Sequence, residues 1–134
     1  MENTQTRNTK LKICIVDDSD HSRINAGKIL ENAGFNIVGL ASSAEEALQI
    51  TGTSEVNLYL IDVVMPDASG IELAKVISDK NSRASIIMMS SLKMENIILE
   101  SISSGAIDFL SKPFDADELI KSVEKIELEL SRDI

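Results

Sequence analysis

The segment LKICIVDDS, residues 11–19, joins a short apolar run to a pair of acidic residues. A run of this length that is rich in Ile and Val is typical of a strand whose two faces are both covered, as in a parallel sheet. Four more runs of the same kind follow along the chain, separated by longer stretches with helical periodicity. This alternation predicts an α/β domain in which crossover helices connect parallel strands.

The same alternation gives the number and the bounds of the expected elements. We expect five strands, at residues 11–16, 36–41, 56–61, 85–89 and 107–110, and five helices, at residues 20–33, 43–51, 69–79, 93–103 and 116–131. Ser43 and Glu46 have the spacing of a capping box at the start of the second helix. Gly34 and Gly105 follow the first and fourth helices, where a glycine commonly ends a helix.

In two helices the spacing of apolar residues predicts the buried face. The last helix carries one apolar stripe, formed by Leu119, Val123, Ile126 and Leu130. In the fourth helix we expect an inner face of Met94, Ile98 and Ile102. Leu99 then lies outside this inner face, where it is either part of a surface for a partner or partly buried.

The composition limits the class of protein. The 134 residues are enough for one domain, which we expect over residues 11–134, after a flexible polar arm at residues 1–10. The 13 basic and 22 acidic residues give a net charge of −9, and the aromatic residues are three Phe and one Tyr. Such a chain would repel nucleic acid and offers few aromatic rings for stacking bases, so we expect no direct contact with nucleic acid.

The apolar segments and the single cysteine suggest where the protein works. No segment has the length of a membrane span or the pattern of a signal peptide, so we expect no membrane insertion and a cytoplasmic location. Cys14 is the only cysteine, which excludes a disulfide within the chain. Because it lies inside an apolar run, we expect it to be a small buried side chain.

Polar residues directly follow four of the five predicted strands. Asp17 and Asp18 follow the first strand, Asp62 the third, Ser90 the fourth and Lys112 the fifth. The carboxyl ends of parallel strands meet at one edge of an open sheet, so we expect these side chains to lie close together. Each residue alone also has an ordinary role, as a helix cap or a turn residue. Their joint placement favours a functional site.

The combination of three acids, a hydroxyl and an amine indicates a particular chemistry. Carboxylates gathered in one crevice repel one another, and a hard cation such as Mg²⁺ relieves this repulsion. A carboxylate beside Mg²⁺ can act as a nucleophile toward a phosphoryl group, while Lys112 and Ser90 can stabilise charge on the transferred oxygens. The residues therefore predict, in outline, a site that forms an aspartyl phosphate.

Four separated motifs resemble those of a known family, in its order and with its spacing. They are VDDS at residues 16–19, LIDVVMP at 60–66 with Gly70, MMSS at 88–91, and GAIDFLSKPF at 105–114. Here the sequence resembles the receiver domains of two-component response regulators, especially the stand-alone chemotaxis type, over residues 10–134. The resemblance implies a flavodoxin-like, doubly wound fold with strand order 2-1-3-4-5.

The resemblance also implies a role for each site residue. Asp62 would accept a phosphoryl group from a histidine kinase or a phosphotransfer protein. Asp17, Asp18 and Asp62 would bind Mg²⁺ together with the backbone carbonyl of Val64, and Lys112 would pair with the phosphoryl oxygens. The protein would then be a signalling phosphoprotein that catalyses only its own phosphorylation and slow dephosphorylation.

The family's switch pair corresponds to Ser90 and Phe109, and Pro113 is expected to follow a cis peptide bond. Two departures occur: Ser90 stands where many relatives have Thr, and Phe109 stands where the chemotaxis prototypes have Tyr. A switch that depends on a tyrosine hydroxyl cannot operate in this chain. Because the predicted elements leave no room for an effector domain, we expect output by docking to a protein partner, through the fourth helix, fifth strand and fifth helix.

Three alternatives remain open at this point. A small Mg²⁺-dependent phosphohydrolase of the haloacid-dehalogenase type would use similar residues, although its nucleophile stands on the first strand. A pseudo-receiver would only bind partners, which the complete acidic set argues against. His21, the only histidine, could itself hold a phosphoryl group or a metal.

Overall fold

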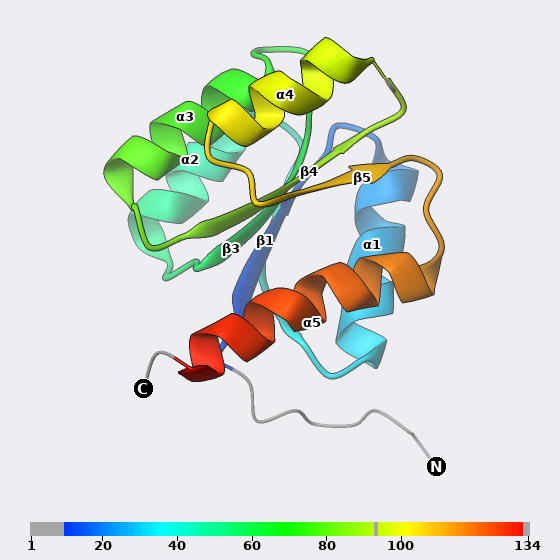
Figure 1. Ribbon diagram of the computed structural model, residues 1–134. Coiled ribbons are helices and arrows are strands. Elements are labelled where there is room, and N and C mark those ends of the chain that lie inside the picture. Colours follow the sequence, from blue (N-terminus) through cyan, green and yellow to red (C-terminus); the bar gives the residue numbers. More distant parts are fainter. Residues whose placement is uncertain (1–9, 93, 133–134) are drawn as a thin grey trace.

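The computed structural model describes residues 10–92 and 94–132, which form five strands and five helices in strict alternation (Figure 1). The strands are β1 (Lys12–Val16), β2 (Asn36–Ala41), β3 (Leu58–Asp62), β4 (Ser85–Ser90) and β5 (Asp108–Ser111). The helices are α1 (Asp20–Asn32), α2 (Ala44–Thr53), α3 (Gly70–Lys80), α4 (Glu95–Ser103) and α5 (Ala116–Arg132). Most of the predicted arm, residues 1–10, lies outside the described residues, as does Lys93, the predicted first residue of the fourth helix.

The five strands form one parallel sheet in the order β2-β1-β3-β4-β5. Helices α1 and α5 cover one face of the sheet, and α2, α3 and α4 cover the other (Figure 1). This doubly wound arrangement confirms the predicted fold class and the predicted strand order. In the described parts of the chain, no helix is long and apolar enough to cross a lipid bilayer.

Alternate residues of the strands build two separate cores. Ile13, Leu60 and their equivalents face α1 and α5, whereas Cys14, Tyr59 and their equivalents face the other three helices. Cys14 is fully buried, and burial raises the pKa of its thiol to about 12. The expectation of a small buried side chain at this position is confirmed.

Most element boundaries differ from the prediction by one or two residues, and one cap differs as well. Helix α2 continues to Thr53, and β3 starts only at Leu58. The Ser43 hydroxyl accepts from the backbone N–H of Glu46 at 3.1 Å, as a capping box requires. The Glu46 carboxylate, however, accepts from the backbone N–H of Ser42 at 2.6 Å, so the reciprocal bond is shifted by one residue. Gly34 and Gly105 have φ values of 94° and 112°, which confirms them as helix stops.

The predicted inner face of the fourth helix is wrong at Met94 and Ile102, and its third member, Ile98, is partly buried. Met94 is 57% exposed and Ile102 is also exposed, whereas Ile97 packs on the core and Ser101 is buried. Ser101 can be buried because its hydroxyl donates to the Ile97 carbonyl at 2.8 Å. In α5 the predicted stripe is confirmed: Leu119, Val123 and Ile126 are buried, and Leu130 is partly buried against them.

Candidate functional site

Three carboxylates come together at the carboxyl end of the sheet. β1 and β3 are neighbouring strands, and Val16 pairs with Ile61, so the residues that follow them are brought side by side. Asp17, Asp18 and Asp62 each offer an oxygen within 4.8 Å of the others. Asp17 and Asp62 are buried, whereas Asp18 is exposed to solvent.

Lys112 connects two of these carboxylates. Its ammonium donates to Oδ2 of Asp17 at 2.7 Å and to Oδ2 of Asp62 at 2.8 Å. The backbone N–H of Lys112 donates to the Ser90 carbonyl at 2.8 Å, and the peptide bond to Pro113 is cis, as predicted. Burial lowers the pKa of Lys112, but the hydrogen bonds and charges of the two carboxylates outweigh it and raise the pKa overall.

The pKa of Asp62 is raised above its ordinary value. Burial is the largest cause, and it outweighs the opposing hydrogen bonds from Lys112 and the Val64 N–H. Because the pKa is higher in the folded state, ionised Asp62 costs stability at neutral pH. This cost is relieved as the pH falls through the folded-state pKa.

Three of the predicted site residues are held by the same kind of local hydrogen bond. The side chain of each accepts from the backbone N–H two residues further on, as in an Asx turn. The distances are 2.9 Å from Ser19 to Asp17 Oδ1, 3.0 Å from Val64 to Asp62 Oδ1, and 2.9 Å from Leu92 to Ser90 Oγ. The sequence analysis missed this pattern, although a short polar residue at the end of each strand is its signal.

Ser90, Phe109 and His21 form no hydrogen bond with these carboxylates in the described part of the chain. Ser90 is fully buried, one residue beyond Met89, which pairs with Asp62 across β3 and β4. Phe109 is half-buried and pairs with Met88. His21 is exposed in the first turn of α1, and it is not a member of the carboxylate cluster. The switch roles of Ser90 and Phe109 stay predictions.

The carboxylate cluster suits a hard divalent cation. Oxygen ligands of this kind are those that Mg²⁺ prefers, and Asp18 leaves the cluster open to solvent on one side. Asp17, Asp18 and Asp62 could therefore hold the ion. The contribution of the Val64 carbonyl stays a prediction, although the N–H of the same residue is already bound to Asp62.

Arg23, which the sequence analysis did not single out, holds the loop that carries Asp17. Its guanidinium donates to the Asp17 carbonyl at 2.7 Å and to Oδ1 of Asp20 at 2.5 Å. The arginine side chain is only 14% exposed, so its bond to the Asp17 carbonyl is partly shielded from water, whereas Asp20 is 82% exposed. The spacing of Asp20 and Arg23, three residues apart at a helix start, predicts their ion pair but not the bond to the Asp17 carbonyl.

Replacing Arg23 by Met should weaken Mg²⁺ binding about tenfold, because the loop that presents two of the carboxylates loses its support. Isothermal titration with MgCl₂ measures the affinity, and urea unfolding of the metal-free variant shows separately whether the fold itself is affected. Lys28→Met removes an exposed charge from the same helix and is the matched control. If both variants bind Mg²⁺ with equal affinity, Arg23 does not position the site.

Gly70 lets the start of α3 approach the end of β3. Its backbone N–H donates to the Val63 carbonyl at 2.7 Å. A Cβ atom at this position would lie 2.1 Å from the Asp62 carbonyl oxygen, far inside contact distance. The glycine of the third-strand motif is therefore part of the architecture that places Asp62.

The loop after Asp62 is also attached to a neighbouring helix. The Asp67 carboxylate accepts from the backbone N–H groups of Ala44 and Glu45, each at 3.1 Å, at the start of α2. The bond from Ala44 is the main reason why the pKa of Asp67 is lowered. The Asp67 carboxylate therefore attaches this loop to the start of α2.

Comparison with known proteins agrees with the observed fold. Residues 13–124 match the family model of the response regulator receiver domain. The chemotaxis protein CheY of Bacillus subtilis (strain 168) is 32% identical, over 85% of this chain and 95% of that protein. The chain belongs to the response regulator receiver family.

Two solved structures extend this result. The CheY-like receiver domain protein of Methanospirillum hungatei JF-1 is 25% identical, with a TM-score of 0.87 over 92% of this chain and 98% of that one. A chain of the CheX-CheY-BeF3-Mg²⁺ complex of Borrelia burgdorferi is 25% identical, with a TM-score of 0.83 over 94% of this chain and 98% of that one.

The family membership determines the class of the protein. Receiver domains are signalling proteins of two-component systems, and they bind Mg²⁺ at an acidic pocket. The matches therefore support the predicted signalling class, and they give no support to the haloacid-dehalogenase alternative.

Proposed function

We propose that this protein is a phosphorylation-dependent switch in which Asp62 accepts a phosphoryl group from a histidine kinase or a phosphotransfer protein. The observation that carries this proposal is the position of Lys112, whose ammonium bridges Asp17 and Asp62 within the carboxylate cluster. A buried carboxylate beside a fixed cation, with two more acids for a metal, is suited to phosphoryl transfer.

In the transfer, an oxygen of Asp62 attacks the phosphorus of a phosphohistidine. The new O–P bond forms as the N–P bond breaks, and the imidazole nitrogen keeps the electron pair and takes up a proton. Asp17, Asp18 and Asp62 would hold Mg²⁺, which supplies positive charge for the phosphoryl oxygens. Lys112 donates hydrogen bonds to these oxygens. The fixed N–H groups of Val64 and Leu92 keep Asp62 and Ser90 oriented.

Acetyl phosphate tests this chemistry without any partner protein. Intact mass spectrometry should detect one added phosphoryl group in the presence of MgCl₂ and none in the presence of EDTA, because the clustered carboxylates repel a phosphate dianion. Uptake at the same rate in EDTA would contradict the proposed metal-dependent site.

The donor would approach beside Lys112. A hollow of about 290 Å³ lies there, between the start of α1 and the loop after β5. His21, Asn25 and Phe114 line it together with Lys112. We propose that the phosphohistidine of the donor enters at this hollow, because Lys112 forms part of its lining.

The switch would act through Ser90 and Phe109. In the described form the Ser90 hydroxyl accepts from the Leu92 N–H at 2.9 Å, so it is held by the loop that leads to α4. A phosphoryl group on Asp62 offers this hydroxyl a stronger, charged acceptor. A move of Ser90 would pull on the loop, and half-buried Phe109 would respond by changing its packing.

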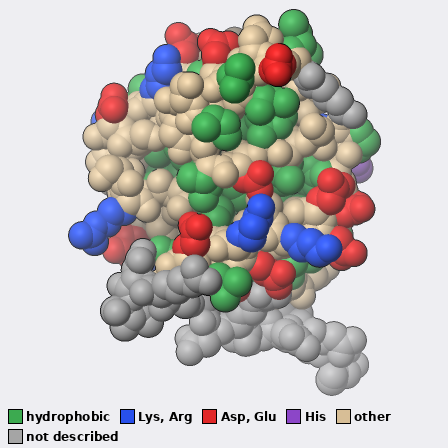
Figure 2. All heavy atoms as spheres, viewed as in Figure 1, with side chains coloured by type: hydrophobic (Ala, Val, Ile, Leu, Met, Phe, Trp, Pro, Cys, Tyr) green, Lys and Arg blue, Asp and Glu red, His purple; other side chains and the backbone are tan. Residues whose placement is uncertain are grey.

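We propose the surface of α4, β5 and α5 as the docking face for the output partner. Figure 2 shows hydrophobic side chains gathered on this side of the molecule, with charged side chains among and below them. Leu99 is 61% exposed, and Ile107 on the same face is also exposed. The neighbouring Asp108 accepts from Ser122 at 2.6 Å and pairs with Lys125 at 3.4 Å, which fixes α5 against β5.

Replacing Leu99 by Glu should leave phosphorylation and folding intact and weaken capture of the partner by the protein held in its BeF₃⁻-bound state. An exposed substitution of this kind changes the free energy of unfolding by about 0.5 kcal/mol or less. Ile97→Glu is the matched control, since Ile97 packs on the core and its variant should be destabilised. A Leu99 variant that unfolds as easily as the Ile97 variant would place Leu99 in the core.

The aspartyl phosphate should be long-lived. Val64 and Leu92 follow Asp62 and Ser90 by two residues, and they are 54% and 40% exposed beside the site. Neither side chain can orient a water molecule, and both can shield the phosphorus. The double variant Val64→Asn, Leu92→Glu should therefore lose its phosphoryl group at least about tenfold faster once the donor is removed. Equal decay in parent and variant, followed by mass spectrometry, would refute this explanation.

A further inference from the structure

A carboxylate joins the loop after Asp62 to the start of α2. Oδ1 of Asp67 accepts from the Ala44 N–H and Oδ2 accepts from the Glu45 N–H, each at 3.1 Å. N–H groups in the first turn of a helix have no acceptor within the helix, and the positive end of the helix favours a negatively charged one. Asp67 therefore caps α2 from another loop, 23 residues further along the chain.

The turn that leads into α2 is also bonded to the loop of Asp17. The Asp17 N–H donates to the carbonyl of Ala41, the last residue of β2, at 3.0 Å. In the next residue, the N–H and the hydroxyl of Ser42 donate to the Glu46 carboxylate at 2.6 and 2.7 Å. This part of the chain is thus bonded internally, and it contacts both of the loops that carry buried site carboxylates.

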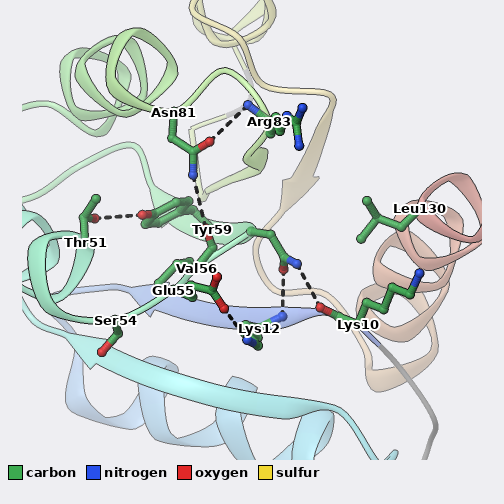
Figure 3. Close-up of a pocket in the computed structure, with 11 residues that line it drawn as sticks. Lys10, Lys12, Thr51, Ser54, Glu55, Val56, Tyr59, Asn81, Arg83 and Leu130 are labelled. Carbon is green, nitrogen blue, oxygen red and sulfur yellow. Dashed lines mark hydrogen bonds and ion pairs between the residues drawn. The ribbon is translucent and has the colours of Figure 1, made fainter. Parts of the chain in front are cut away.

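The other end of α2 is attached to the sheet. The hydroxyl groups of Thr51 and of Tyr59, a residue of β3, lie 2.7 Å apart (Figure 3). The Thr51 hydroxyl donates to the Ala47 carbonyl at 2.9 Å, so Tyr59 is the donor to Thr51. Tyr59 is fully buried, and Ala44 and Ala47 of α2 are buried as well. Since α2 is held by this bond and by packing, it can serve as a fixed support for the loop.

The attachment by Asp67 restrains the position of Val64. Val64 lies three residues before Asp67, and Pro66 stands between them. Because proline has a fixed φ angle, this short segment is stiff, and a displacement of Asp67 should reach Val64. The Val64 N–H already donates to Oδ1 of Asp62 at 3.0 Å, and the carbonyl of the same residue is the proposed backbone ligand of Mg²⁺.

We propose that Asp67 is a positioning residue of the magnesium site and that, through it, the start of α2 responds to occupation of that site. This role rests on the proposed function, since the Val64 carbonyl is one of the proposed Mg²⁺ ligands. Coupling of this kind is reciprocal: if the attachment to α2 favours metal binding, bound metal must favour the attachment. The start of α2 then gives the domain a second response, separate from the proposed movement of Ser90 and the loop before α4.

Replacing Asp67 by Ala should raise the dissociation constant for Mg²⁺ about tenfold, because the loop loses its support. Isothermal titration with MgCl₂ measures the constant. Asp67→Asn keeps one acceptor oxygen, so its constant should lie between those of the parent and of Asp67→Ala. Ser43→Ala is the matched control, since it removes another cap of α2, the bond to the Glu46 N–H, and leaves the loop attached. This control should have a lower midpoint of urea unfolding, as Asp67→Ala should, but it should bind Mg²⁺ like the parent.

Backbone amide signals in NMR spectra report the response of α2 itself. When the parent is titrated with MgCl₂, the signals of Ala44 and Glu45 should shift together with that of Ser19 and saturate at the same concentration. In Asp67→Ala the Ser19 signal should still shift, at higher Mg²⁺ concentrations, whereas the signals of Ala44 and Glu45 should not.

The outcomes separate the role of Asp67 from the metal site itself. A parent that binds no Mg²⁺ would overturn the proposed site and this role together. If the parent binds Mg²⁺, three results would overturn the role of Asp67 alone. They are equal affinity of the parent and Asp67→Ala, an equal loss of affinity in Ser43→Ala, and an unchanged shift of the Ala44 signal in Asp67→Ala.

Discussion

Replacing Asp62 by Asn should abolish uptake of a phosphoryl group from acetyl phosphate in the presence of Mg²⁺. The substitution keeps the shape of the side chain but replaces a carboxylate by an amide, which is a far poorer nucleophile. We expect the rate measured by intact mass spectrometry to fall at least about a thousandfold. Asp79→Asn, the same change at an exposed position of α3, should react like the parent.

Loss of fold cannot account for such a result. The raised pKa of Asp62 means that its charge opposes folding at neutral pH, so the Asn variant should unfold at no lower urea concentration than the parent. If a stable Asp62→Asn variant were phosphorylated as fast as the Asp79→Asn variant, the phosphoryl group would be attached elsewhere.

Replacing Gly70 by Ala should lower the free energy of unfolding by about 2–4 kcal/mol. The added Cβ would lie 2.1 Å from the Asp62 carbonyl oxygen and 2.9 Å from the Val63 Cα. Both of these are backbone atoms, so relief requires α3 to move away from β3. Urea unfolding measures the loss. We also expect slower phosphorylation of the variant, since the same shift displaces Asp62.

Gly52→Ala is the matched control for this substitution. Gly52 lies near the end of α2, and a Cβ there would meet no atom within 4 Å. Alanine has a helix propensity about 1 kcal/mol better than glycine, so this variant should be as stable as the parent or more stable. Equal stability of the Gly70 and Gly52 variants would contradict the close approach at Asp62.

The sheet could be predicted because its signals are local. Runs of Ile and Val mark the strands, and the acids, the hydroxyl and the lysine directly after them belong to one edge of any parallel sheet. The strand order followed from the family resemblance, and the structure confirms it. The placement of Asp17, Asp18, Asp62 and Lys112 in one cluster can therefore be predicted from the sequence.

The inner face of α4 could not be predicted, because apolar residues surround this short helix. Met94, Ile97, Ile98, Leu99 and Ile102 leave no single apolar stripe, and the buried face includes a serine. Burial of Ser101 depends on a hydrogen bond within the helix, which periodicity of apolar residues does not reveal. Periodicity is informative only where one side of a helix is polar, as in α5.

The support of the site was also hidden from the sequence. Arg23 contacts a backbone carbonyl, and the role of Gly70 is to leave space for one. Each of these contacts ends on a backbone carbonyl, which every residue has. No pair of residue types in the sequence therefore predicts either contact. Such interactions become visible only when the path of the main chain is known.

The most direct test of the central claim is to locate the phosphoryl group itself. Sodium borohydride reduces an aspartyl phosphate to homoserine, which tandem mass spectrometry can read within the tryptic peptides of residues 13–23 and 29–75. After treatment with acetyl phosphate and Mg²⁺, we predict homoserine at position 62 and an unmodified Asp67 in the same peptide. Homoserine at position 17, 18 or 67, with intact Asp62, would contradict the assignment of Asp62 as the phosphoacceptor.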